Sequence, residues 1–145
     1  MKRIALFAAI TLAALVMTGC PSLNSTQRQQ AAQASENVTI VLVAAQKAEI
    51  TAHEQALISD SDHVFIQQQF LTVARLDKAT NDCILKATDT HGTVACLTTA
   101  TVTLDQINAE GGSFLKSAQA KQQFTFTLLS IRTTLSSIAQ VLGGK

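Results

Sequence analysis

The residues best suited to acid–base or metal chemistry gather in one short stretch of the sequence. Two histidines and four acidic residues share it: Glu49, His53, Glu54, Asp60, Asp62 and His63. Two neighbouring helices could bring His53 and His63 together, and imidazole and carboxylate groups are common metal ligands. However, the zinc-protease helix motif and the Glu-x-x-His spacing of di-iron bundles are both absent. We therefore expect no metal ion and no cofactor, and we expect these charged side chains to be solvated.

No nucleophile has the sequence surroundings of a catalytic residue. Serine and threonine are numerous, but none lies in a Gly-x-Ser-x-Gly elbow. The glycine pairs at 111–112 and 143–144 lack the remaining pattern of a phosphate-binding loop. These features favour a protein that is not an enzyme and has no catalytic residues, although a triad assembled from distant positions stays open.

The first twenty residues have the layout of a secretory signal. Lys2 and Arg3 give a positive start, and residues 4–17 are apolar apart from Thr11. This apolar run is too short, and wrongly flanked, for a helix that stays in the bilayer. We therefore predict an exported protein.

The end of that segment, Val16-Met17-Thr18-Gly19-Cys20, resembles the lipobox of bacterial lipoproteins, with Met17 where that family more often has Leu. The resemblance implies that residues 1–19 are a signal peptide and that Cys20 carries lipid. The lipid would then anchor the protein to a membrane of the cell envelope, facing the periplasm. Cys20 is followed by Pro21 rather than by the Asp that commonly marks inner-membrane retention in enterobacteria. Both the inner and the outer membrane are therefore candidates for the anchor.

The mature chain is about the size of one domain, and its composition argues against some classes of binding protein. Loss of Lys2 and Arg3 changes the formal charge from +1 to −1, so no concentrated basic surface exists for nucleic acid. The mature chain has no Trp or Tyr, and five Phe are its only aromatic residues. This weakens interpretation as a sugar-binding protein or as a large, tight protein interface, since both commonly use Trp and Tyr.

The spacing of apolar residues predicts that the first helix spans about 27–58, after a tether at residues 20–30. One stripe along it consists of Ala31, Ala34, Val38, Val41, Ala45, Ala48 and Ala52. Residues 38–45 are apolar apart from Thr39, so we expect this helix to be apolar on most sides and to lie inside the bundle.

The second helix begins after residues 59–62, where Ser59 and Asp62 have capping-box spacing. Its buried face is predicted to hold Ile66, Phe70, Val73, Leu76, Cys83 and Ala87. A third helix, at about 93–110, follows a break at residues 89–92. Its segment 98–103 is rich in β-branched residues and could be a strand, but a lone strand would leave its backbone unpaired.

A third break is predicted at Gly111-Gly112-Ser113, with Ser113 capping the fourth helix. That helix has the strongest heptad pattern, formed by Phe124, Leu128, Ile131, Leu135, Ile138 and Leu142. Four helices joined by short turns predict an all-α fold, an antiparallel up-down-up-down four-helix bundle over residues 31–145.

Cys83 and Cys96 remain once Cys20 carries lipid, an even number in a compartment that permits disulfides. The Asp89-Thr90 pair is the midpoint between them, so a hairpin of the second and third helices places both at the same height. We predict a disulfide, with two free buried thiols as the alternative.

For function, we expect a non-catalytic structural or interaction subunit of the envelope, with an unidentified envelope protein as its partner. The alternative is a carrier or sensor that binds a small apolar ligand between its helices. A pocket lined by Phe65, Phe70, Phe114 and Leu128 would favour the carrier, whereas an exposed apolar patch on a filled bundle would favour the subunit.

Overall fold

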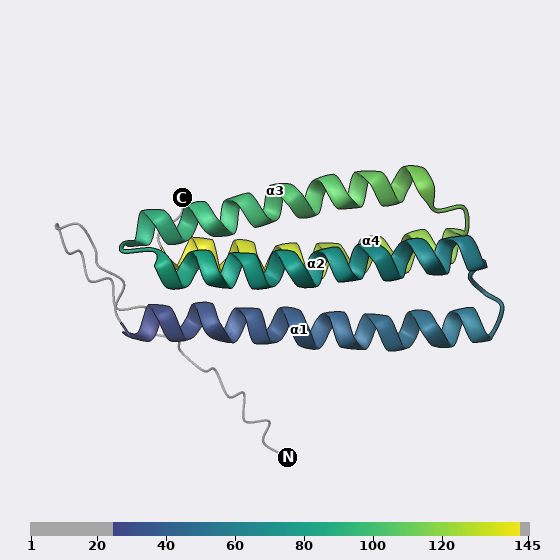
Figure 1. Cartoon of the computed structure of the whole chain (residues 1–145), viewed down its shortest axis with the longest axis horizontal. Coiled ribbons are helices and arrows are strands. Elements are labelled where there is room, and N and C mark those ends of the chain that lie inside the picture. The colour runs from purple at the N-terminus through teal and green to yellow at the C-terminus, as the bar shows by residue number, and fades with distance from the viewer. Residues whose placement is uncertain (1–24, 143–145) are drawn as a thin grey trace, which may run out of the picture.

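The computed structural model describes residues 25–142, which form four helices and no strand. Helix α1 spans Ser25–Glu54, α2 spans Asp60–Lys86, α3 spans Thr90–Phe114 and α4 spans Ala118–Val141. The four helices pack side by side in a bundle (Figure 1). Within the described residues, α1 and α3 each contact α2 and α4 but not each other. The predicted all-α helical bundle is confirmed.

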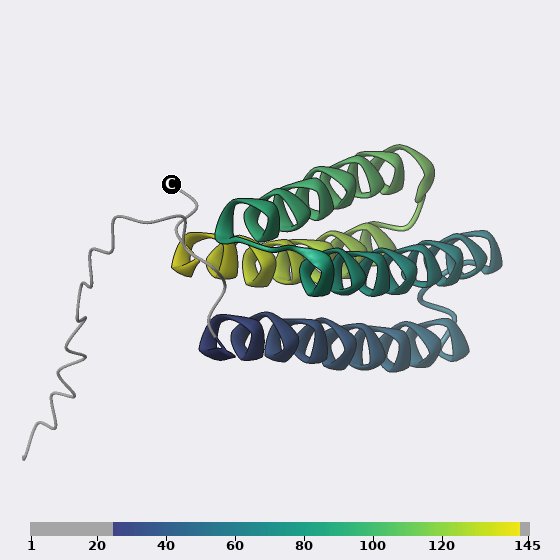
Figure 2. The ribbon, with the colours of Figure 1, turned by 60° about the vertical axis from the view of Figure 1, so that its left-hand side comes forward.

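Three short turns join the helices at alternating ends of the bundle (Figure 1). Residues 55–59 and 115–117 turn at one end, where the Ser117 hydroxyl donates a hydrogen bond to the Leu57 carbonyl at 3.3 Å. Residues 87–89 turn at the other end, where the last turn of α4 also lies near the start of α1 (Figure 2). We call these the double-turn end and the single-turn end.

Three of the helices begin at a side chain that caps them. The hydroxyls of Ser59 and Ser117 accept hydrogen bonds from the amides of Asp62 and Ala120, and the Asp89 carboxylate accepts from Gly92. Each cap satisfies an amide that has no partner within its own helix. The predicted cap at Ser59 is confirmed, while α3 begins at Thr90, inside the segment that we expected to be a break.

The predicted break at Gly111-Gly112 is wrong, because α3 continues through both glycines to Phe114. A β-carbon added to Gly111 would lie 2.1 Å from Cε1 of Phe124, whereas one added to Gly112 would meet nothing within 4 Å. Gly111 therefore leaves room for the Phe124 ring to pack close to the α3 backbone, and it does not form a turn. Ser113 is not a cap, since its hydroxyl donates to the Ala109 carbonyl inside the helix.

The β-branched segment of α3 is helical, as predicted. Hydroxyls of Thr99, Thr101 and Thr103 donate to backbone carbonyls three or four residues earlier, at 2.8–2.9 Å. Such bonds let exposed threonines satisfy their own hydroxyls on a helix surface. The buried side of the helix packs Leu97, Ala100, Leu104 and Ile107 into the core.

The prediction for α1 needs two corrections. The helix begins at Ser25, inside the expected tether, and it ends at Glu54 rather than near residue 58. In the turn that follows, Ala56 has a positive φ of 57°. It also lies at the edge, because it packs against only α2 and α4 and leaves Ile40, Val43 and Ile50 exposed. The predicted stripe is buried at Ala34, Val38 and Ala52, half-buried at Val41 and Ala45, and exposed at Ala48.

The predicted apolar faces of α2 and α4 pack into the core together with residues of α1 and α3. Phe124 is fully buried, with the rings of Phe65 and Phe70 centred 6.0 and 6.1 Å away. From α2, Ile66, Phe70 and Val73 are buried as predicted, but Cys83 is exposed and Ala87 lies beyond the helix. From α4, Phe124, Leu128, Ile131 and Leu135 are buried, and Ile138 packs against them.

Candidate functional site

A cavity of about 340 Å³ lies between α1 and α4, above the core ring of Phe124. Three alanines of α1 face it, Ala44, Ala45 and Ala48, and their side chains end at the β-carbon. The remaining apolar lining is Val41, Ile66, Phe70, Phe124 and Phe126. Its volume falls within the range of small-molecule sites in proteins and is about twice that of a cavity known to hold benzene.

Glu49 and Gln123 are two of the four polar residues in this lining. Glu49 is only 1 % exposed, and its two carboxyl oxygens contact His63 Nδ1, at 2.6 Å, and Gln67 Nε2, which donates to it. Oε1 of Gln123 is also buried, but it has no hydrogen-bond partner among the described residues. Thr127 and Ser130 complete the polar part of the lining, and their hydroxyls donate to the backbone carbonyls of Gln123 and Phe126 within α4.

The two histidines lie together, which two neighbouring helices made possible, but the expected solvation of the acids is wrong for Glu49. The His53 and His63 rings stack with centroids 4.1 Å apart and an interplanar angle of 13°. His53 Nε2 pairs with exposed Asp60 at 2.8 Å, while His63 pairs with buried Glu49. Glu49 lies four residues after Ala45 and three before Ala52, so the stripe itself could have indicated its burial.

The second acid that we expected to be solvated, Asp62, is completely buried. Its two carboxylate oxygens accept hydrogen bonds from the backbone amides of Lys116 and Ser117, at 3.0 and 2.9 Å. Asp62 therefore fastens the α3–α4 turn to the start of α2 instead of completing a capping box with Ser59.

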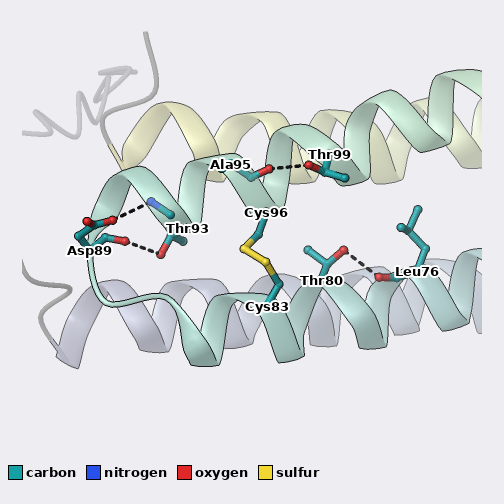
Figure 3. The surroundings of a disulfide bond; sticks show 9 residues. Leu76, Thr80, Cys83, Asp89, Thr93, Ala95, Cys96 and Thr99 are labelled. Atoms are coloured by element: carbon teal, nitrogen blue, oxygen red, sulfur yellow. Dashed lines mark hydrogen bonds between the residues drawn. A yellow bond between two sulfur atoms is a disulfide. The ribbon is translucent and has the colours of Figure 1, made fainter.

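The two remaining cysteines lie at disulfide distance near the single-turn end. Their Cα atoms are 5.9 Å apart and their sulfur atoms 1.95 Å apart, and Cys83 and Cys96 point toward each other from α2 and α3 (Figure 3). Threonine hydroxyls bond to carbonyls of the same helix on either side, Thr80 to Leu76 and Thr99 to Ala95. The equal height that the sequence predicted is what lets the sulfurs meet. Cys20 lies outside the described residues.

Exposed apolar side chains recur at heptad spacing on two helices. Ile40, Val43 and Ile50 do so on α1, and Val64, Leu71 and Leu85 on α2. Spacings of three, seven and fourteen residues place each set on one face of its helix. We call these two sets the outer stripes.

The cavity differs from the pocket that the sequence suggested. Phe70 lines it, but Leu128 is buried in the core, and Phe65 and Phe114 stack on each other 4.4 Å apart. The rings of Phe124 and Phe126, two residues apart on α4, take their places. Sequence reasoning missed Gln123, for which we find no sequence signal.

Two carboxyl groups of α2 have shifted pKa values. Burial raises the pKa of half-buried Asp77, while hydrogen bonds from Ser35 and Thr39 of α1 lower it by less. A hydrogen bond and the charge of Lys78 lower the pKa of exposed Asp82.

Comparisons of the chain with protein-family models, with curated proteins and with solved structures found no match. Among residues 25–142, no group of three or more His, Cys, Asp or Glu side chains is arranged to hold a metal ion. Within the same residues, no helix has both the length and the apolar character needed to span a bilayer.

Proposed function

We propose that this chain is a lipid-anchored, non-catalytic subunit of the bacterial cell envelope. Its mature part would be an antiparallel up-down-up-down bundle, which the alternating ends of the three turns support (Figure 1). The anchor rests on the basic start, the apolar run of residues 4–17 and the Thr18-Gly19-Cys20 junction. Helix α1 begins only five residues after Cys20, so a short segment would hold the bundle near the membrane surface.

The interaction role rests on one observation, the outer stripes. Ile40 and Leu71 are each more than half exposed, and α1 and α2 turn these residues away from the core. Apolar residues at heptad spacing on an exposed helix face are typical of a surface that receives another helix. The partner that fits this chemistry is an amphipathic helix of another envelope protein.

The anchor is tested by Cys20→Ser, with Cys83→Ser as the matched control. Metabolic labelling with an alkyne-tagged palmitate should label the wild type and Cys83→Ser but not Cys20→Ser, because only Cys20 has the lipobox context. Cys20→Ser should also keep the mass of the uncut chain. Labelling of Cys20→Ser, or membrane retention with unchanged processing, would contradict the lipoprotein proposal.

The interaction role is tested by a photo-crosslinking residue placed at Val43 or Leu71, with exposed Thr125 of α4 as the control. Irradiation of whole cells should give one discrete adduct from both stripe positions and none from position 125. Adding Ile50→Lys should abolish the adduct at position 43 without lowering Tm, since Ile50 is exposed. Equal adducts from all three positions, or an adduct that survives Ile50→Lys, would refute the assignment of this face.

A further inference from the structure

We propose that the envelope protein that covers the outer stripes is a second copy of this chain, related to the first by a two-fold axis parallel to the helices. This inference rests on the interaction role proposed above and names its partner. Helix α1 of each copy would pack on α2 of the other, so that the stripes of both copies are covered.

The two outer stripes border the same seam between α1 and α2. Val43 follows by four residues Thr39, whose side chain bonds to α2. Val64 precedes by three residues Gln67, whose side chain bonds to α1. Residues three or four apart are neighbours on a helix surface, so each stripe lies just outside the row that contacts the other helix. The stripes therefore form one face.

Contacts across the seam show which positions of α1 and α2 lie at the same height. Glu49 contacts both His63 and Gln67, so in the proposed antiparallel arrangement it lies level with residue 65, midway between them. One residue closer to the turn on each helix, Ile50 therefore lies level with Val64.

The same reasoning applies further from that turn. Asp77 accepts hydrogen bonds from Ser35 and Thr39, so it lies level with residue 37, and Glu36 lies level with Lys78. Three levels, one heptad apart, therefore pair exposed residues of α1 and α2: Ile50 with Val64, Val43 with Leu71, and Glu36 with Lys78.

These levels make the face complementary to itself. A two-fold axis parallel to the helices keeps each residue at its own height and places α1 of one copy opposite α2 of the other. Apolar levels then meet apolar levels, and Glu36 of each copy meets Lys78 of the other. Lys78 Nζ already bonds to Asp82 at 2.7 Å, but its side chain is 78 % exposed and an ammonium group has three donors.

A two-fold axis perpendicular to the helices fits less well. It would place the charged level of one copy opposite the Ile50 and Val64 level of the other, and it would put the two proposed lipid anchors at opposite ends. The parallel axis leaves both anchors on one side, as a single membrane requires. Glu54 and Asp60 lie beyond the apolar levels, and their like charges limit the face at the double-turn end.

The size of the face favours pairing on a membrane. Between the levels of Val64 and Leu85 it is roughly 32 Å long at 1.5 Å per residue, and two helices are about 20 Å wide. About 600 Å² per copy is at the lower limit for specific interfaces. Anchoring both copies in one membrane raises their effective concentration, whereas the domain without residues 1–20 would stay monomeric in dilute solution.

The partner is tested by co-expressing two full-length copies with different tags, one of which carries a photo-crosslinking residue at Leu71. Irradiation of cells should join the two tags, and peptide mass spectrometry should place the adduct near Val43 of the second copy. The same residue at exposed Thr125 of α4 is the control and should join none.

The axis is tested by reversing charges. Glu36→Lys in both copies, or Lys78→Glu in both, places like charges opposite each other twice and should reduce the two-tag adduct about tenfold. Glu36→Lys in one copy and Lys78→Glu in the other restores both attractive pairs and should recover the adduct, which no contact within one copy would do. Lys121→Glu, at an exposed position of α4, should change nothing.

The outcomes separate this inference from the proposed function. An adduct that joins Leu71 to a different protein would refute the second copy and leave the interaction role standing, whereas absence of any adduct at Leu71 would refute both. A two-tag adduct that the charge reversals leave unchanged, or that the mixed pair does not recover, would refute the parallel axis.

Discussion

At the double-turn end, buried polar side chains fasten the helices, whereas near the single-turn end a sulfur pair does so. Asp62 reaches across to two amides of the α3–α4 turn, and Glu49 pairs with His63 of the next helix. Near the other end, Cys83 and Cys96 connect α2 to α3. The first arrangement consists of hydrogen bonds and the second of sulfur atoms at disulfide distance, so a reductant should act on the second alone.

The two ends also differ in how far away the acceptors of their backbone amides lie in the sequence. The α3–α4 turn leaves the amides of Lys116 and Ser117 without helical partners, and a buried carboxylate from α2 accepts both. At the single turn, the Asp89 carboxylate accepts a hydrogen bond from the Gly92 amide of the helix that it caps. The double-turn end is therefore held by a carboxylate that reaches a distant turn, whereas near the single-turn end the two helices meet through sulfur.

The largest expected loss follows from Asp62→Ala. It would remove the buried carboxylate that accepts from the Lys116 and Ser117 amides, and we expect the free energy of unfolding to fall by about 4 kcal/mol. Urea denaturation of the domain without residues 1–20, which we predict is a soluble helical monomer, measures this loss. Asp60→Ala, which removes an acid whose side chain is 99 % exposed, should cost less than about 1 kcal/mol. Similar losses for both variants would disprove the role of Asp62.

The sulfur pair is expected to contribute about 3 kcal/mol, the value typical of a loop of this length. The double variant Cys83→Ser, Cys96→Ser should lose this amount, and a reductant should lower the Tm of the wild type to that of the variant. The same reductant should leave the Tm of the double variant unchanged. Two titratable thiols in denatured, unreduced protein from the envelope would show that the bond does not form in the cell.

Gly111→Ala and Gly112→Ala separate packing from helix propensity at the double-turn end. The first should destabilise by about 2 kcal/mol, because its β-carbon would overlap the buried ring of Phe124. The second should stabilise by up to about 1 kcal/mol, since alanine favours helix over glycine and its β-carbon meets nothing. Thermal unfolding of the two variants gives the comparison, and equal effects would show that the contact with Phe124 does not require glycine at position 111.

The smallest effect is expected from Asp77→Asn. Since burial raises the pKa of Asp77 in the folded state, the wild type binds this proton more tightly when folded and loses stability as pH rises through that pKa. The variant lacks this loss, so at neutral pH it should be more stable by up to about 0.5 kcal/mol. The advantage should vanish at acidic pH, and melting curves across the pH range check this. An advantage that persists in acid would exclude the titration of Asp77 as its cause.

Much of the fold was predictable because it follows from local chemistry. The apolar spacing of Phe124 to Leu135 indicated the buried face of α4, and Ser59 indicated the start of α2. The equal distance of Cys83 and Cys96 from the Asp89-Thr90 turn indicated that they would meet. The cavity could not be predicted, because its lining comes from three helices and one of its polar residues, Gln123, lies in no recognisable pattern.

By itself, the sequence determined the helical class, the capping at Ser59 and the pairing of two cysteines, since each depends on residues close in the chain. Only the tertiary structure showed that Gly111 lies inside a helix. The reason for glycine there is the Phe124 ring of another helix, which occupies the space that a β-carbon would need. The tertiary structure also decided that Glu49 and Asp62 are buried, because their hydrogen-bond partners come from other helices or from a turn more than fifty residues away. A carboxylate far from its partners in sequence resembles any solvated charge until the chain brings those donors to it.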